Sequence, residues 1–199
     1  MEFVPYDEFK NVEFIAEGGF SKIYKATWIN GPISGWSFKN KNYYRQSNYT
    51  VVLKSLNNSK NITLELNELK IFYEFSSKWK ENDFSINACV SKYFGIAQDP
   101  SENIMIIMPY YDLGDLIHYV SKRFYNLSWY DKLKDLRFII IGLIDLHSVN
   151  IIHKDFHSGN IFYSNRFGVL IGDLGISKST TISTEDNEIY GIIRSLYDS

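Results

Sequence analysis

Two acidic side chains and one amide in the second half of the chain occupy positions from which they could do chemistry. Asp155 and Asn160 stand five positions apart in a turn-forming segment, with short apolar runs at 151–152 and 161–163 on either side. Runs of this size are typical of buried strands, so the segment between them is expected to be a tight loop held rigid at both ends. Catalytic residues are commonly presented on such loops. Asp173 follows another apolar pair in a glycine-flanked turn.

The order and spacing of these residues resemble the catalytic core of protein kinases. Residues 153–160 match the family's His-Arg-Asp-x-x-x-x-Asn loop, with Lys154 in place of the arginine, and Asp173-Leu174-Gly175 matches its Asp-Phe-Gly motif. Phosphoryl transfer depends on positioning and charge neutralisation, so the family needs a base for the acceptor hydroxyl and oxygen ligands for Mg²⁺. The resemblance implies that Asp155 is the base, and that Asn160 and Asp173 hold the metal.

His157 stands where many serine/threonine kinases carry a lysine, so the resemblance implies that it approaches the γ-phosphate of ATP. The alternative is a polar residue that only fills the loop. Asp155, Asn160 and Asp173 have an alternative as well, because Asp and Asn favour turns in any protein. Two motifs in the family's order and distance weigh against that interpretation.

The composition is that of a globular protein with an ample core. Of the 199 residues 45% are hydrophobic and 17% aromatic, which favours packing over disorder. The net charge of −2 gives no general attraction to nucleic acid or anionic membranes. Cys89 is alone, the N-terminus lacks the layout of a secretion signal, and the apolar run at 138–144 is too short to span a bilayer. We therefore expect a cytoplasmic or nuclear protein without nucleic-acid or membrane partners.

The N-terminal segment contains a glycine turn between two partly alternating runs at 12–16 and 22–26, which predicts a hairpin. It resembles the kinase glycine-rich loop, although only the middle glycine of the pattern is kept. Small residues still allow the backbone to lie close to phosphates, so the resemblance implies a nucleotide-covering loop. A plain hairpin is the alternative. The residues of this loop are Ala16, Gly18, Gly19, Phe20, Ser21 and Ile23.

A lysine inside an apolar, β-branched run at 49–56 is costly to bury unless an anion or a carboxylate meets it. The run resembles the kinase Val-Ala-Ile-Lys strand, which makes Lys54 the residue that grips the nucleotide phosphates. A lysine that reaches solvent from a strand edge is the alternative. The next segment, 63–75, is strongly helical, and the resemblance places on it a glutamate that pairs with Lys54. Glu68 suits the family's distance better than Glu65, although helical periodicity does not separate the two.

The middle of the chain predicts a long connection at 29–48, two strands at 90–96 and 103–108, and a helix at 116–124. The break at 109–115 resembles the kinase hinge. Met108 would then be the gatekeeper beside the adenine, and backbone groups of Pro109 and Tyr111 would bind the base. Asp115 would contact ribose or peptide, with a simple helix N-cap as an equally good alternative.

Residues 128–149 predict the longest helix, capped by Ser128, and its centre at 138–144 is apolar on nearly every side. Such a helix is expected to be buried all round. The Ala-Pro-Glu motif and the helices that follow it in kinases do not appear before Ser199. This predicts an apolar surface on the helix that a partner covers.

These observations predict an α+β, bilobal, protein-kinase-like fold. Residues 1–108 would form an N-lobe with a five-stranded antiparallel sheet and one helix, and 109–199 the hinge and an incomplete, mainly helical C-lobe. The predicted activity is transfer of the ATP γ-phosphate to a protein hydroxyl of Ser or Thr, with Mg²⁺. One alternative is a nucleotide-binding regulatory fragment without phosphate transfer. Another is a small-molecule phosphotransferase of the aminoglycoside or choline type, which carries a similar catalytic loop.

Overall fold

The structure is a computed structural model that describes residues 1–17, 21–39, 41–56, 62–81, 89–123 and 125–179. The chain divides into two compact units, residues 1–62 with 92–110 and residues 63–91 with 111–199. The units separate near the predicted hinge, but residues 63–91 cluster with the second unit. The division into lobes at residue 108 stays a prediction.

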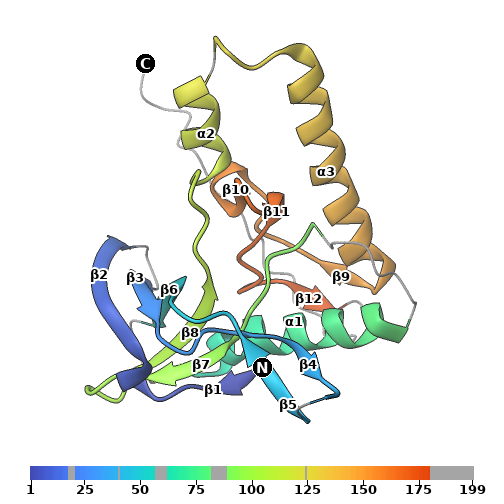
Figure 1. The fold of residues 1–199 in the computed structure, drawn as a ribbon. Coiled ribbons are helices and arrows are strands. Elements are labelled where there is room, and N and C mark those ends of the chain that lie inside the picture. The colour runs from blue at the N-terminus through green and yellow to red at the C-terminus, as the bar shows by residue number, and fades with distance from the viewer. Residues whose placement is uncertain (18–20, 40, 57–61, 82–88, 124, 180–199) are drawn as a thin grey trace. The chain divides into compact units, whose positions relative to one another are not determined.

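The first unit is built on one six-stranded sheet in the order β1-β7-β8-β6-β3-β2 (Figure 1). Five of these strands pair antiparallel, and short β1 joins the edge parallel to β7. The predicted five-stranded sheet is therefore extended by one strand. Gly95 on β7 permits that pairing, because a Cβ there would lie 1.9 Å from the carbonyl oxygen of Glu2. The strands are β1 (Glu2–Phe3), β2 (Phe9–Glu17), β3 (Ser21–Trp28), β6 (Tyr49–Leu56), β7 (Gly95–Gln98) and β8 (Ile104–Pro109), with a 3₁₀ turn η1 (Tyr6–Glu8).

The segment at 29–48, predicted to be a connection, contains a small sheet of two strands that is separate from the six-stranded sheet. Its strands are β4 (Ile33–Ser37) and β5 (Asn42–Arg45). Trp36 and Tyr43 are directly opposite, with ring centroids 4.7 Å apart. Arg45 ties the hairpin to the unit through the carboxylate of Glu2 and the carbonyl of Gly31. Cross-strand aromatic pairs stabilise two-stranded ribbons of this kind. The polar composition of residues 29–48 gives no signal for this hairpin.

The described residues of the second unit form three helices, two small two-stranded sheets and one 3₁₀ turn. The helices are α1 (Ile62–Glu81), α2 (Leu116–Arg123) and α3 (Trp129–Ser148). The short elements are β9 (Ile151–Ile152), η3 (Ser158–Asn160), β10 (Ile161–Ser164), β11 (Gly168–Ile171) and β12 (Lys178–Ser179). A small core of Ile139, Ile161, Tyr163 and Val169 joins α3 to the β10–β11 hairpin. The predicted strand at 90–96 begins only at Gly95, because residues 89–91 pair instead with β11.

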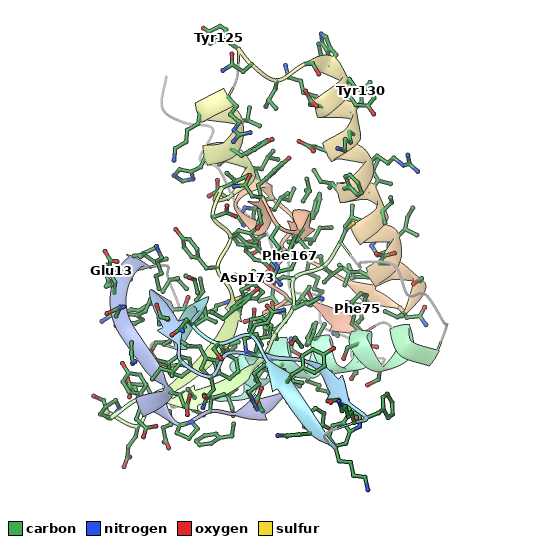
Figure 2. All side chains as sticks on the ribbon, in the orientation of Figure 1. Glu13, Phe75, Tyr125, Tyr130, Phe167 and Asp173 are labelled. Atoms are coloured by element: carbon green, nitrogen blue, oxygen red, sulfur yellow. The ribbon has the colours of Figure 1, made fainter. Side chains whose placement is uncertain are left out.

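Helix α3 is one residue shorter at each end than the predicted 128–149. It has the predicted cap, since the Ser128 hydroxyl accepts the N–H of Asp131 at 3.1 Å. The expectation that it is buried all round is wrong. Only the face of Ile139 and Leu146 is buried, where the helix packs on β11. Tyr130 projects from the start of the helix, away from β10 and β11 (Figure 2). Large apolar side chains on the other face are exposed, among them Trp129, Leu133, Leu136, Ile140 and Ile144.

No helix among the described residues combines the length and the apolar content needed to cross a membrane.

Candidate active site

The loop between β9 and β10 brings Asp155 and Asn160 together. Apolar pairs at both ends form short strands, and the turn η3 closes the loop. The Asn160 amide nitrogen donates to the carbonyl oxygen of Asp155 at 2.9 Å and to its carboxylate Oδ2 at 3.1 Å. Both amide hydrogens of the buried Asn160 are thereby directed at Asp155. Asp155 and Asn160, five positions apart in the sequence, are therefore bonded directly to each other across the loop.

His153 links this loop to the turn after β11 that carries Asp173, the residue labelled in Figure 2. Its Nε2 lies 2.9 Å from the carbonyl oxygen of Gly172, and its Nδ1 lies 3.3 Å from the backbone nitrogen of Asp155. A carbonyl oxygen only accepts and a backbone N–H only donates, so His153 is neutral with its proton on Nε2. The N–H of Gly172 also donates to the carbonyl oxygen of Asn160 at 2.9 Å. The two motifs are held side by side by these bonds.

Burial of His153 predicts a pH-dependent stability. Desolvation lowers the pKa of this side chain below its ordinary value of about 6.5, against the opposing effect of the bond to Gly172. As the pH falls through about 6.5, the unfolded chain binds a proton at this histidine, whereas the folded chain binds it only at a lower pH. The free energy of unfolding should be highest above pH 6.5 and fall below it, by at most about 1.4 kcal/mol per pH unit. Urea unfolding between pH 7.5 and 5.5 measures the slope.

The matched comparison is His153→Gln against His147→Gln, because His147 is exposed on α3. The first variant should flatten the slope and the second should keep it. If the pH dependence of the free energy of unfolding were unchanged in His153→Gln, it could not be assigned to His153.

Helix α1 is tied to the segment after Asp173 by a residue that sequence analysis did not single out. The Asn67 amide donates to the carbonyl oxygens of Gly175 at 2.9 Å and Ser177 at 3.0 Å. Glu68, the next residue, is only 2% exposed, and its Oε2 lies 3.9 Å from the position that a Cβ on Gly175 would occupy. The predicted glutamate thus faces the Asp-Leu-Gly turn. The choice of Glu68 over Glu65 stays a prediction.

Ser177 joins the segment after Asp173 to the catalytic loop. Its hydroxyl donates to the carbonyl oxygen of His153 at 3.0 Å, and the following β12 pairs antiparallel with β9. The start of the segment after Asp173 is therefore fixed to both α1 and the catalytic loop. The hydroxyl-rich composition that follows gives no signal for these contacts.

The predicted phosphate-binding residues lie in the first unit. Lys54 is half-buried on β6, opposite Ile23 on β3 and Ile106 on β8. Ala16 pairs with Ile23 across the β2–β3 hairpin, and Ser21 begins β3. Gly18, Gly19 and Phe20 lie outside the described residues. The pairing of Lys54 with Glu68 stays a prediction.

The predicted hinge residues fall at the end of β8 and just beyond it. Met108 and Pro109 pair with Val52 and Val51 of β6, and both are buried. Tyr111 belongs to the second unit, where its hydroxyl lies 2.7 Å from the Ser91 hydroxyl. Its ring stacks on Phe162 at 5.2 Å. The roles of these residues toward adenine stay predictions.

Asp115 has the geometry of a helix N-cap, the alternative to a ribose or peptide contact. It precedes α2, and its Oδ1 accepts the backbone N–H of His118 at 2.8 Å. The same oxygen lies 2.9 Å from Nδ1 of His118. This is the arrangement of a helix N-cap, which satisfies a donor of the first turn. A contact with ribose or peptide would be an additional role.

Comparison with known proteins gives a concordant result. A model of the family described as protein tyrosine and serine/threonine kinase matches residues 9–191. The relatives include a probable serine/threonine-protein kinase of Dictyostelium discoideum, 25% identical over 88% of this chain, and the probable serine/threonine-protein kinase PBL20 of Arabidopsis thaliana, 28% identical over 86%. The interferon-induced, double-stranded RNA-activated protein kinase of Rattus norvegicus is 27% identical over 90%.

The chain spans 9%, 40% and 33% of the lengths of these three relatives, respectively. The family match covers nearly the whole chain, from the β2 strand of the first unit to the segment beyond Asp173. The chain therefore belongs to the protein tyrosine and serine/threonine kinase family.

Proposed function

We propose that the protein transfers the γ-phosphoryl group of ATP to a serine or threonine hydroxyl of a protein substrate. The acceptor oxygen forms a bond to the γ-phosphorus while the bond from that phosphorus to the bridging oxygen breaks. ADP leaves with the bonding electrons, and Asp155 takes the hydroxyl proton. The names of the relatives favour Ser or Thr as the acceptor.

The observation that carries the proposal is the bonded set of Asp155, Asn160, His153 and Gly172. In this set the proposed base, Asp155, is bonded to the amide of Asn160, and Gly172 fixes the backbone next to Asp173, which supports catalysis by positioning. An ordinary surface turn has no need of a fully buried histidine that joins it to a second turn.

The residues present fit a magnesium ion. Asn160 and Asp173 are oxygen donors on backbone segments joined by the Gly172–Asn160 hydrogen bond. Among the described residues no group of three or more His, Cys, Asp or Glu forms a closed metal cage. Mg²⁺ commonly uses one or two protein ligands together with phosphate oxygens and waters. When bound, the ion would neutralise charge on the phosphates, and Asn160 and Asp173 would hold it.

The remaining roles follow the family pattern. Lys54, paired with Glu68, would hold the phosphates, and the loop of residues 16–23 would cover them. Met108, Pro109 and Tyr111 would bind adenine. Residues 1–108 would form the N-lobe, and residues 109–199 the hinge and the partial C-lobe. Cys89, the one cysteine of the chain, is buried and in no disulfide, which suits the reducing cytoplasm or nucleus.

Binding of ATP is expected to stabilise the protein through Lys54. Saturation with Mg²⁺-ATP at about 100 times the dissociation constant should add about 2.7 kcal/mol to the free energy of unfolding. Lys54→Ala should lose most of the resulting shift in melting temperature, whereas Lys39→Ala, on the β4–β5 hairpin, should keep it. Thermal unfolding with and without nucleotide measures both, and an autophosphorylation assay runs in parallel.

The outcomes separate the alternatives. Absence of any nucleotide-dependent shift contradicts both the kinase and the regulatory-fragment interpretations. A shift without phosphate transfer supports the regulatory fragment. Transfer to amino alcohols in preference to peptide pools supports the small-molecule phosphotransferase.

A further inference from the structure

The ring of His157 is fixed by the turn that follows it. His157 precedes η3, and its Nδ1 lies 3.0 Å from the backbone nitrogen of Gly159. The backbone N–H donates, so Nδ1 accepts and carries no proton. A doubly protonated ring would turn a second N–H toward that of Gly159. The geometry therefore specifies a neutral imidazole with its proton on Nε2.

That proton points at the proposed base. Nε2 of His157 lies 3.6 Å from Oδ2 of Asp155, and Asn160 donates to the same oxygen at 3.1 Å. A separation of 3.6 Å is longer than a hydrogen bond. Catalytic hydrogen bonds are often long in the absence of substrate and shorten when substrate binds. Two donors then hold Oδ2, and Oδ1 is the oxygen presented to the acceptor hydroxyl.

Gly159 makes this position of the ring possible. A Cβ at Gly159 would lie 2.9 Å from Cε1 and 3.1 Å from Nδ1 of His157. The backbone of Gly159 is not in the left-handed region, so an alanine there meets the ring without a backbone penalty. The small residue inside the catalytic loop is thus matched to an imidazole at position 157.

We propose that His157 is a positioning residue for phosphoryl transfer, which donates from Nε2 to Oδ2 of Asp155 and orients Oδ1 toward the acceptor hydroxyl. The proposal rests on the kinase function and replaces the expected approach of His157 to the γ-phosphate. A neutral ring whose one N–H faces a carboxylate is poorly suited to grip a phosphate. It is well suited to restrict the rotamer of Asp155 alongside Asn160.

Steady-state kinetics of three variants test the proposal. His157→Ala should lower kcat by about tenfold to a hundredfold, the cost of a displaced catalytic group, with KM for ATP unchanged. His157→Gln, whose amide reaches about as far as Nε2, should restore most of kcat. Gly159→Ala should lower kcat like His157→Ala although the histidine is present, and His147→Ala should match the wild type.

A loss of ATP affinity in proportion to kcat in His157→Ala would overturn the proposal, because it would indicate a phosphate ligand. Failure of the glutamine to restore kcat, or wild-type kcat in Gly159→Ala, would also overturn it.

A second measurement needs neither activity nor a stable variant in the catalytic loop. In the ¹⁵N-imidazole spectrum of the wild-type protein, the His157 signals should show Nε2 protonated and Nδ1 unprotonated at pH 7.5. A protonated Nδ1 would overturn the proposal. A wild type that transfers no phosphate but shows the expected tautomer would contradict the proposed function and leave the assigned ring geometry standing.

Discussion

Asp155→Asn is expected to lower kcat by about a hundredfold to ten-thousandfold, the usual contribution of a general base. An asparagine retains the shape of the aspartate and offers a carbonyl oxygen to the Asn160 amide, so the loop contacts should persist. It cannot take the proton of the acceptor hydroxyl. Binding of ATP should be retained, and the nucleotide-dependent shift in melting temperature should equal that of the wild type. Peptide phosphorylation kinetics and thermal unfolding measure the two quantities.

Asp99 supplies the matched control, because it is a turn former of the ordinary kind. In the turn between β7 and β8 its Oδ1 accepts the backbone N–H groups of Ser101 and Asn103, each at 2.8 Å. Its Oδ2 also accepts the side-chain amide of Asn103 at 3.0 Å, and the amide nitrogen of an asparagine at position 99 would place two donors against each other there. The Asp155 carboxylate accepts the Asn160 amide and, among the described contacts, no backbone N–H. Asp99→Asn should therefore reduce stability without reducing kcat, and Asp155→Asn the reverse. If Asp155→Asn kept kcat and lost stability, Asp155 would be a turn former too.

The features that were predictable from sequence depend on neighbours close in the chain. Strand β6 has the predicted bounds of 49–56, since Val51, Leu53 and Ser55 alternate into the core. The cap of α3 involves only Ser128 and Asp131. The Asp155–Asn160 contact spans five positions between two apolar runs. In each of these cases the relevant partners lie within one window of sequence, so local periodicity and turn chemistry suffice.

The features that were missed depend on contacts between distant segments. Asn67 reaches Gly175, 108 positions away, and nothing in the helical pattern of α1 distinguishes it from a solvated side chain. Residues 89–91 leave the predicted strand because β11 offers them backbone partners. The contacts of His157 with Gly159 and Asp155 are likewise a matter of ring orientation, and the role of His157 toward the phosphate stays a prediction. Spacing alone carries no information on such orientations.

Burial differs sharply between two tryptophans of this chain, and the difference predicts the second large effect. Trp28 on β3 is 1% exposed, with Phe9 and Phe94 at 6.1 Å between ring centroids and the Arg45 guanidinium 5.8 Å from its ring. Trp28→Ala should cost about 3–5 kcal/mol. That is a large share of the roughly 5–15 kcal/mol that stabilises a whole domain. Denaturant unfolding followed by far-ultraviolet circular dichroism measures the loss.

Trp129 is the control for the same deletion, because it is 77% exposed at the start of α3. Its described contact is the Lys132 ammonium, 4.9 Å from the ring centroid. An exposed cation–π pair contributes about 0.5–1 kcal/mol, so Trp129→Ala should cost no more than that. A cost for Trp129→Ala equal to that for Trp28→Ala would contradict the exposed fraction seen here. It would mean that the apolar face of α3 is covered in solution, as its composition predicts for a helix that meets a partner.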